Sequence, residues 1–312
     1  MRAPRGVTEE RGHQIVHFRQ AFHGRGGYTL SLTNTADPRK YQYYARFDWP
    51  RVTNPGLRFP LDAAELARVT ALENRSLAEI KQAFARSGDD IAAIILEPIQ
   101  AEGGDHHFRP EYLRALRALA DENQALLIWD EVQSGMGITG RMWAHQHADV
   151  RPDLLAFGKK AQICGIMAGG RIDEEPDNVF RTSSRINSTW GGNLVDMVRC
   201  TRFLEILQEE KLLENSTTVG ARLLAGLETL QRERPDLVSN ARGKGLMCAI
   251  DLPDGETRDR VADAMYQNGA IILGCGVRSL RFRPPLDVTV AEIEEGIGLV
   301  RRSLQQVSQK SA

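Results

Sequence analysis

The chain has 312 residues, of which 42% are hydrophobic and 26% are charged, as in a globular protein large enough for two domains. Its formal net charge of −1 argues against a general nucleic-acid or membrane-surface role. It contains no stretch of about 18 or more apolar residues, so no membrane-spanning helix is expected. Residues 1–14 are basic at first but lack the apolar core of a secretory signal.

The cysteines and histidines suggest neither disulfides nor a metal site. The four cysteines include no CxxC pair, which favours reduced thiols in the cytoplasm. His106 and His107 form one close pair and His145 and His147 another, but no matching ligand cluster accompanies them. A tetrahedral zinc site needs such a cluster, so we expect no metal.

Short apolar runs predict the strands of a mostly parallel sheet. The expected strands lie at residues 14–18, 91–96, 125–129, 154–157 and 168–171. The run IAAIIL at residues 91–96 is continuous, which is typical of a strand buried on both faces. Helical spacing at residues 111–123 separates two of these strands and makes a βαβ unit. We therefore expect an α/β large domain.

Helical patterns fill much of the remaining chain. Residues 63–86 have helical spacing that we expect to break near Glu73 and Asn74, whereas residues 40–61 read as irregular. Further helices are expected at residues 194–215, 217–233, 258–268 and 288–307, with short strands within 240–252 and at 271–273. We place a domain boundary near Gln208, which gives a large domain of residues 1–207 and a small α+β domain of residues 208–312.

Residues 125–165 carry the strongest chemical signal. Asp130 and Glu131 stand where one strand ends, and Lys159 and Lys160 follow the next strand. Ligands of open α/β sheets bind outside the carboxyl ends of the strands, so this acid and this lysine can face one ligand. Pyridoxal phosphate needs such a pair, because a lysine amine holds it and an acid keeps its ring nitrogen protonated. The alternative interpretation is that both are solvated loop residues.

The stretch WDEVQSGMGITGRMWAHQHADVRPDLLAFGKK resembles the signature of class III aminotransferases, which are fold type I enzymes dependent on pyridoxal phosphate. The resemblance extends from about residue 13 to the C-terminus. It implies that Asp130 meets the pyridinium nitrogen and that Gln133 lies near the ring oxygen of the cofactor. It also implies that the lysine following a small residue forms the Schiff base. That lysine is Lys159, with Lys160 as the competing choice.

Three further motifs resemble this class, and FHGR and the glutamate of EPIQAEGGD resemble its lysine-specific branch. FHGR implies that Phe22 stacks on the cofactor ring and that Arg25 contacts a substrate carboxylate. EPIQAEGGD implies that Glu102 alternately pairs with and releases an active-site arginine, so that lysine and 2-oxoglutarate use one pocket. LRFRPPL implies that Arg281 binds the substrate α-carboxylate, with Arg283 the less favoured neighbour. Without the resemblance, these would be ordinary surface charges.

RINSTWGGN at residues 185–193 allows two interpretations. Its polar residues could simply cap a helix that starts near Asn193. The resemblance implies instead that Thr189 reaches across a homodimer to the cofactor phosphate of the partner subunit, with Asn187 close by on the substrate side. A homodimer with shared active sites is therefore expected.

The resemblance implies transfer of the ε-amino group of L-lysine to 2-oxoglutarate, giving 2-amino-6-oxohexanoate and glutamate. Another ω-aminotransferase, acting on ornithine or 4-aminobutyrate, is the alternative within the class. Class III enzymes also carry a glycine/serine loop before FHGR that holds the cofactor phosphate at a helix N-terminus. No such loop stands upstream of residue 13. We therefore expect a shortened chain or another mode of phosphate binding, and a non-catalytic remnant is the rival hypothesis.

Overall fold

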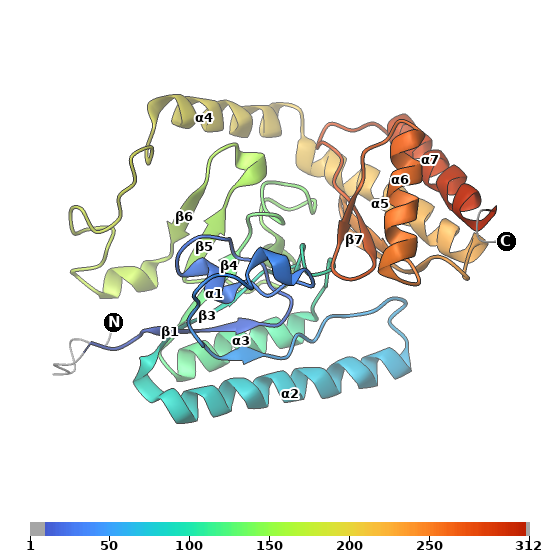
Figure 1. The fold of residues 1–312 in the computed structure, drawn as a ribbon. Helices are drawn as coiled ribbons and strands as arrows, with labels where there is room; N and C mark the ends of the chain where they lie inside the picture. The colour runs from blue at the N-terminus through green and yellow to red at the C-terminus, as the bar shows by residue number, and fades with distance from the viewer. Residues whose placement is uncertain (1–9, 310–312) are drawn as a thin grey trace.

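The computed structural model describes residues 10–309, so residues 1–9 of the basic N-terminal stretch and residues 310–312 lie outside the described part. Two sheets carry the fold, one from each part of the sequence (Figure 1). Together with their helices they confirm the expected class, a mostly parallel large sheet followed by a smaller α+β unit.

The large sheet has six strands in the order β2-β1-β3-β4-β5-β6. Its strands are β1 (Gln14–Phe18), β2 (Arg51–Val52), β3 (Ile91–Leu96), β4 (Leu126–Asp130), β5 (Leu154–Phe157) and β6 (Gly165–Ala168). All neighbouring strands are parallel except β5 and β6, which are antiparallel. The strand expected at residues 168–171 is wrong, because β6 ends at Ala168 and a 3₁₀ turn, η6 (Gly170–Glu174), follows. The chain reverses soon after β5, which the apolar pattern did not indicate.

Two helices, α2 (Ala63–Ser87) and α3 (Pro110–Glu122), lie along one face of the large sheet (Figure 1). They bury Ile80 and Leu116 in one apolar cluster with Trp129 of β4. The expected break at Glu73 is wrong, since α2 is continuous over 25 residues. No glycine or proline interrupts it, and the buried Glu73 carboxylate accepts a hydrogen bond from Arg109 Nε at 2.9 Å.

The small sheet is antiparallel, with strand order β7-β8-β10-β9. Its strands are β7 (Ser239–Lys244), β8 (Met247–Asp251), β9 (Leu273–Cys275) and β10 (Ser279–Phe282). Helices α5 (Leu212–Glu233), α6 (Gly255–Gln267) and α7 (Val290–Gln309) pack beside this sheet (Figure 1). Their buried side chains, Leu227, Val261 and Val300, form one cluster with Ile250 of β8.

Helix α4 (Leu194–Glu209) precedes α5 and bridges the two parts of the chain (Figure 1). The helix break expected at residues 215–217 lies instead near Lys211, whose φ of +51° places it in the left-handed region. The domain boundary near Gln208 stays a prediction. The short helical segments are α1 (Thr29–Leu32), η2 (Pro38–Lys40), η3 (Gly88–Asp90), η4 (Ala144–His147) and η5 (Lys159–Ala161). No helix between residues 10 and 309 has both the length and the apolar character needed to cross a lipid bilayer.

Truncation of a core leucine tests this packing. Leu116 is fully buried on α3, whereas Leu66 on α2 is 42% exposed. We expect Leu116→Ala to lower the free energy of unfolding by about 2–5 kcal/mol, because it leaves a cavity against β4. Leu66→Ala should lower it by less than about 1 kcal/mol. Urea unfolding followed by tryptophan fluorescence measures both, and equal losses would contradict the assigned core.

Candidate active site

Three ionisable side chains lie at or just after the carboxyl ends of adjacent strands of the large sheet. Glu97 follows β3, Asp130 ends β4, and Lys159 begins η5 directly after β5. The parallel register pairs Asp130 with Ala156, three residues before Lys159. The carboxyl ends of these strands meet at one edge of the sheet, where α/β proteins bind their ligands. The structure therefore places the predicted acid and the predicted lysine at the same edge.

His23 holds the Asp130 carboxylate. Its Nδ1 lies 2.7 Å from Asp130 Oδ2, and the imidazole is 1% exposed. The amide of Val132 donates to Asp130 Oδ1 at 3.1 Å, so both carboxylate oxygens have partners. We did not predict His23 from the sequence, although it stands inside the FHGR motif next to Phe22. Within the described residues, its buried Nε2 has no hydrogen-bond partner.

Glu97 lies beside this pair as a second buried acid. Burial raises the pKa of Glu97 to about 7, with the charge of Asp130 adding to the effect and that of His23 opposing it. Burial lowers the pKa of His23, but hydrogen bonding to Asp130 and the charges of both acids raise it above its ordinary value overall. The Glu97 carboxylate accepts the amide of Phe22 at 3.0 Å, which fixes the start of FHGR against β3.

The two candidate lysines differ in their surroundings. Lys159 is exposed, and its φ of +48° is a strained backbone conformation of a kind that clusters at functional sites. Lys160 is half-buried, and its pKa is lowered by burial and by the charge of Arg283. A Cβ added to Gly158 would lie 3.4 Å from a methyl group of Val132, so the lysine loop packs against the residues following β4. The choice of Lys159 over Lys160 remains a prediction.

A second group of predicted residues meets around Arg281. Its Nη1 lies 3.0 Å from Glu102 Oε2 and 3.4 Å from Gln133 Oε1. The other oxygen of Glu102, Oε1, pairs with Lys40 Nζ. Lys40 Nζ also lies 6.0 Å from the centroid of the Phe22 ring. We did not predict Lys40, because it falls in the segment that reads as irregular and belongs to none of the motifs.

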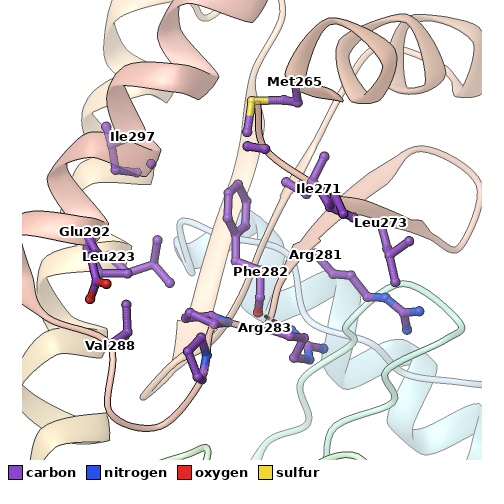
Figure 2. Close-up of a pocket in the computed structure, with 16 residues that line it drawn as sticks. Leu223, Met265, Ile271, Leu273, Arg281, Phe282, Arg283, Val288, Glu292 and Ile297 are labelled. Atoms are coloured by element: carbon purple, nitrogen blue, oxygen red, sulfur yellow. Dashed lines mark hydrogen bonds between the residues drawn. The ribbon is translucent and has the colours of Figure 1, made fainter. Parts of the chain in front are cut away.

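The alternation of β10 explains why Arg281 reaches the large sheet. Figure 2 shows Phe282 directed toward Met265, whereas Arg281 points away from these apolar side chains. Phe282, Arg281 and Arg283 all line one mostly apolar cavity of about 420 Å³ within the small unit. Arg283 follows the last residue of β10 and pairs with Asp105. The Asp105 side chain is only 1% exposed, so Arg283 is the partner of a buried acid, whereas Arg281 pairs with the 17% exposed Glu102. The choice of Arg281 over Arg283 as the carboxylate ligand remains a prediction.

A buried arginine fixes the loop that carries Glu102. Arg242 of β7 is 2% exposed and donates from Nε to the carbonyl of Asp105 at 2.9 Å and from Nη2 to that of Gly104. Its Nη1 lies 2.9 Å from Asp251 Oδ1, which supplies the opposite charge. The loop between β3 and α3 is thereby bound to the small sheet, and Glu102 is presented to Arg281.

Three predicted residues lie apart from this cluster. Arg25 is exposed in the glycine-bearing loop that follows His23. Asn187 and Thr189 are exposed in the segment before α4, and within residues 10–309 neither side chain hydrogen-bonds to the cluster. All three roles stay predictions.

The donor set fits a pyridoxal phosphate ring. The cofactor needs a carboxylate for its ring nitrogen, an amine and a flat apolar surface, which Asp130, Lys159 and Phe22 can provide. Gln133 adds a side-chain amide beside Arg281. No group of three or more His, Cys, Asp and Glu side chains in the described chain is placed to hold a metal ion.

Comparison with known proteins gives the family. A sequence profile described as "Aminotransferase class-III" matches residues 2–304, so the chain belongs to this family, whose members are in general dependent on pyridoxal phosphate. The L-lysine-epsilon aminotransferase of Amycolatopsis lactamdurans is 52% identical over 292 residues, which are 93% of this chain and 64% of that protein. The chain thus spans just under two thirds of that relative.

A solved structure agrees with this match. It is titled lysine aminotransferase from M. tuberculosis in the internal aldimine form, and it superposes with a TM-score of 0.94 at 49% identity. The match covers 98% of this chain and 69% of that one. A probable mitochondrial 4-aminobutyrate aminotransferase of Caenorhabditis elegans is more distant, at 36% identity over 93% of this chain and 60% of that protein.

Protonation of Glu97 gives a test of the buried acids. Its folded-state pKa of about 7 exceeds the ordinary 4.5, so the native state binds this proton more tightly than the unfolded state. The stability that the proton contributes is full below about pH 4.5 and is lost as the pH rises through about 7. We therefore expect the free energy of unfolding of Glu97→Gln, relative to the unmodified chain, to rise between about pH 5 and pH 8.

Glu79→Gln is the matched control. Burial raises the pKa of Glu79, but hydrogen bonds from Thr53 and Arg75 outweigh it and lower the pKa overall. Its stabilisation is lost only as the pH falls through that lowered pKa, so the Glu79→Gln difference should be constant from about pH 5 to pH 8. Urea unfolding across this range measures both variants. If the free energies of unfolding of Glu97→Gln and of the unmodified chain changed in parallel with pH, the raised pKa of Glu97 would be contradicted.

Proposed function

We propose that the chain forms the active site of a pyridoxal-phosphate-dependent aminotransferase that moves the ε-amino group of L-lysine to 2-oxoglutarate. The products are 2-amino-6-oxohexanoate and L-glutamate. The observation that carries this proposal is the ion pair between Arg281 and Glu102. Arg281 would be free to bind a substrate carboxylate only when Glu102 releases it. The names of the relatives about 50% identical to this chain support lysine as the donor.

Each side chain has a role that its position allows. Lys159 would hold the cofactor through Nζ and, once released by the substrate, would take a proton as base from the substrate carbon that bears the ε-amino group and give it as acid to the cofactor. Asp130, oriented by His23, would keep the ring nitrogen protonated. Phe22 and Gln133 would position the ring. The bound cofactor supplies an electron sink for the substrate carbanion.

The charges of the two substrates explain the need for Glu102. L-Lysine carries one carboxylate, whereas 2-oxoglutarate carries two. While Glu102 pairs with Arg281 at 3.0 Å, the guanidinium charge is neutralised and the pocket accepts the amino substrate. When Glu102 withdraws, Arg281 can bind a carboxylate with two parallel hydrogen bonds, and Arg25 is the residue that we expect to bind the other.

A homodimer is the proposed assembly. Apolar side chains gather without cover on α4 and the segment before it, where Trp190, Leu194, Val195 and Val198 are each more than 70% exposed. Figure 1 shows α4 standing away from both sheets. Contiguous exposed apolar surface of this kind marks protein contacts, and Thr189 lies within the same segment. A second copy of the chain would cover this surface and bring Thr189 to the partner's site.

Covalent labelling tests the lysine. We expect borohydride reduction of the chain with pyridoxal phosphate to fix the cofactor to Lys159, as found by peptide mass spectrometry. Lys159→Ala should prevent labelling and lower turnover by at least about 100-fold, because the group that moves the proton is lost. Lys160→Ala is the neighbouring control and should keep labelling. Labelling at Lys160 alone would reverse the assignment.

Comparison of amino donors tests the substrate. With 2-oxoglutarate as acceptor, we expect kcat/KM for L-lysine to exceed those for L-ornithine and 4-aminobutyrate by at least about tenfold, a difference that one well-placed contact can supply. Coupled detection of glutamate measures all three. A preference for ornithine or 4-aminobutyrate would favour the alternative ω-aminotransferase, and no turnover of any donor by a folded, cofactor-bound chain would contradict the proposal.

A further inference from the structure

We propose that Lys40 is a specificity-determining residue of this site, which keeps the Glu102 carboxylate paired when a substrate carboxylate takes Arg281. This inference rests on the proposed function, because it concerns the same pocket and the dicarboxylate substrate assigned to it. It adds a residue that belongs to none of the sequence motifs.

Glu102 divides its two oxygens between two cations. Oε2 lies 3.0 Å from Arg281 Nη1, and Oε1 pairs with Lys40 Nζ. The cations come from unrelated elements, Arg281 from β10 and Lys40 from η2. The Glu102 and Arg281 side chains are 17% and 15% exposed, so both charges are largely removed from water. One acid between two cations leaves the trio with a net positive charge, which suits one further anionic group.

The backbone of Glu102 is fixed, so only its side chain can respond to a ligand. The amide of Gly276 donates to the Glu102 carbonyl at 2.8 Å, and the amide of Ala101 donates to Glu97 at 3.0 Å. A Cβ at Gly276 would lie 2.6 Å from the carbonyl oxygen of Gly103. This close approach holds the loop against the turn between β9 and β10.

There is room for the Glu102 side chain on the Lys40 side. Glu102 and Lys40 line a cavity of about 300 Å³ together with Cys275 and Gly276 of the small unit. Among the described residues, Arg281 does not line this cavity. A rotation of the carboxylate from Arg281 toward Lys40 therefore moves it into open space.

The physical need for Lys40 arises when Arg281 changes partners. A substrate carboxylate on Arg281 deprives Glu102 of one cation and places a second negative charge beside it. A largely buried carboxylate that loses its partner is strongly unfavourable, and like charges in contact add to this. With Lys40 retained, each anion keeps a cation. L-Lysine leaves Glu102 on Arg281, so the effect of Lys40 falls selectively on the dicarboxylate.

Binding of glutarate, a dicarboxylate that cannot be transaminated, tests this without turnover. Isothermal titration of the full chain should show Lys40→Met binding glutarate about fivefold or more weakly, since Glu102 loses its remaining partner. Lys40→Arg keeps the charge and should restore binding to within about twofold. The control is Arg75→Met, which removes a cation of α2 outside this cavity, 64% exposed and paired with Glu79 at 2.9 Å. It should leave binding unchanged.

A double-mutant cycle separates an effect through Glu102 from direct contact with the ligand. In Glu102→Gln there is no charge to retain, so adding Lys40→Met should weaken glutarate binding by less than about twofold. Persistence of the full loss in that background would overturn the proposal, as would equal affinity of Lys40→Met and the unmodified chain. Either result leaves the proposed function in place, whereas absence of glutarate binding by the unmodified chain removes both. Lys40→Gln replaces Lys40→Met if circular dichroism shows the latter unfolded.

Discussion

The ion pair between Arg281 and Glu102 links the two halves of the molecule. Arg281 belongs to the small antiparallel sheet, and Glu102 belongs to the loop that leaves the large parallel sheet. Because the contact is largely buried, breaking it without a replacement would leave unpaired charge in a poorly solvated place. In the function that we propose, a substrate carboxylate is such a replacement. Substrate binding and the contact between the two sheets would then depend on the same side chains.

Neighbouring charged groups fix the residues around this ion pair. Arg242 binds the carbonyls of the Glu102 loop, and Arg283 pairs with the buried Asp105. Both arginines therefore hold the loop in place through these contacts. At the opposite end of the site, His23 is committed to Asp130 in the same way. A preorganised frame of this kind would let Glu102 change partners, as we propose, while the rest of the pocket keeps its geometry.

Much of the frame was readable from the sequence. Apolar runs predicted β3, β4 and β5, so the shared edge that brings Asp130 toward Lys159 followed from the rule for parallel strands. Motif resemblance supplied Glu102, Gln133 and Arg281, and the structure brings these three together. Local patterns failed where tertiary contacts decide. A polar pair at Glu73 suggested a break in α2, but Arg109 satisfies the buried carboxylate and the helix continues.

The least predictable residues act through partners distant in sequence. His23 and Asp130 are 107 residues apart, and Lys40 and Glu102 are 62 apart. Lys40 stands in a segment without periodicity, so no pattern placed it beside the cluster. The antiparallel pairing of β5 with β6 was also not predicted, because an apolar run does not indicate the direction of a strand. Contacts between residues distant in sequence and the direction of a strand are decided by tertiary packing and not by local composition.

We propose above that this cluster holds pyridoxal phosphate and that the bound cofactor accepts the ε-amino group of L-lysine. The most direct measurement is the absorbance spectrum of the purified chain with pyridoxal phosphate, before and after addition of L-lysine. We expect a protein-bound Schiff-base band that retains its intensity after dialysis and disappears when L-lysine converts the cofactor to its amine form. A folded chain that retains no chromophore, or whose band is unchanged by L-lysine, would contradict it.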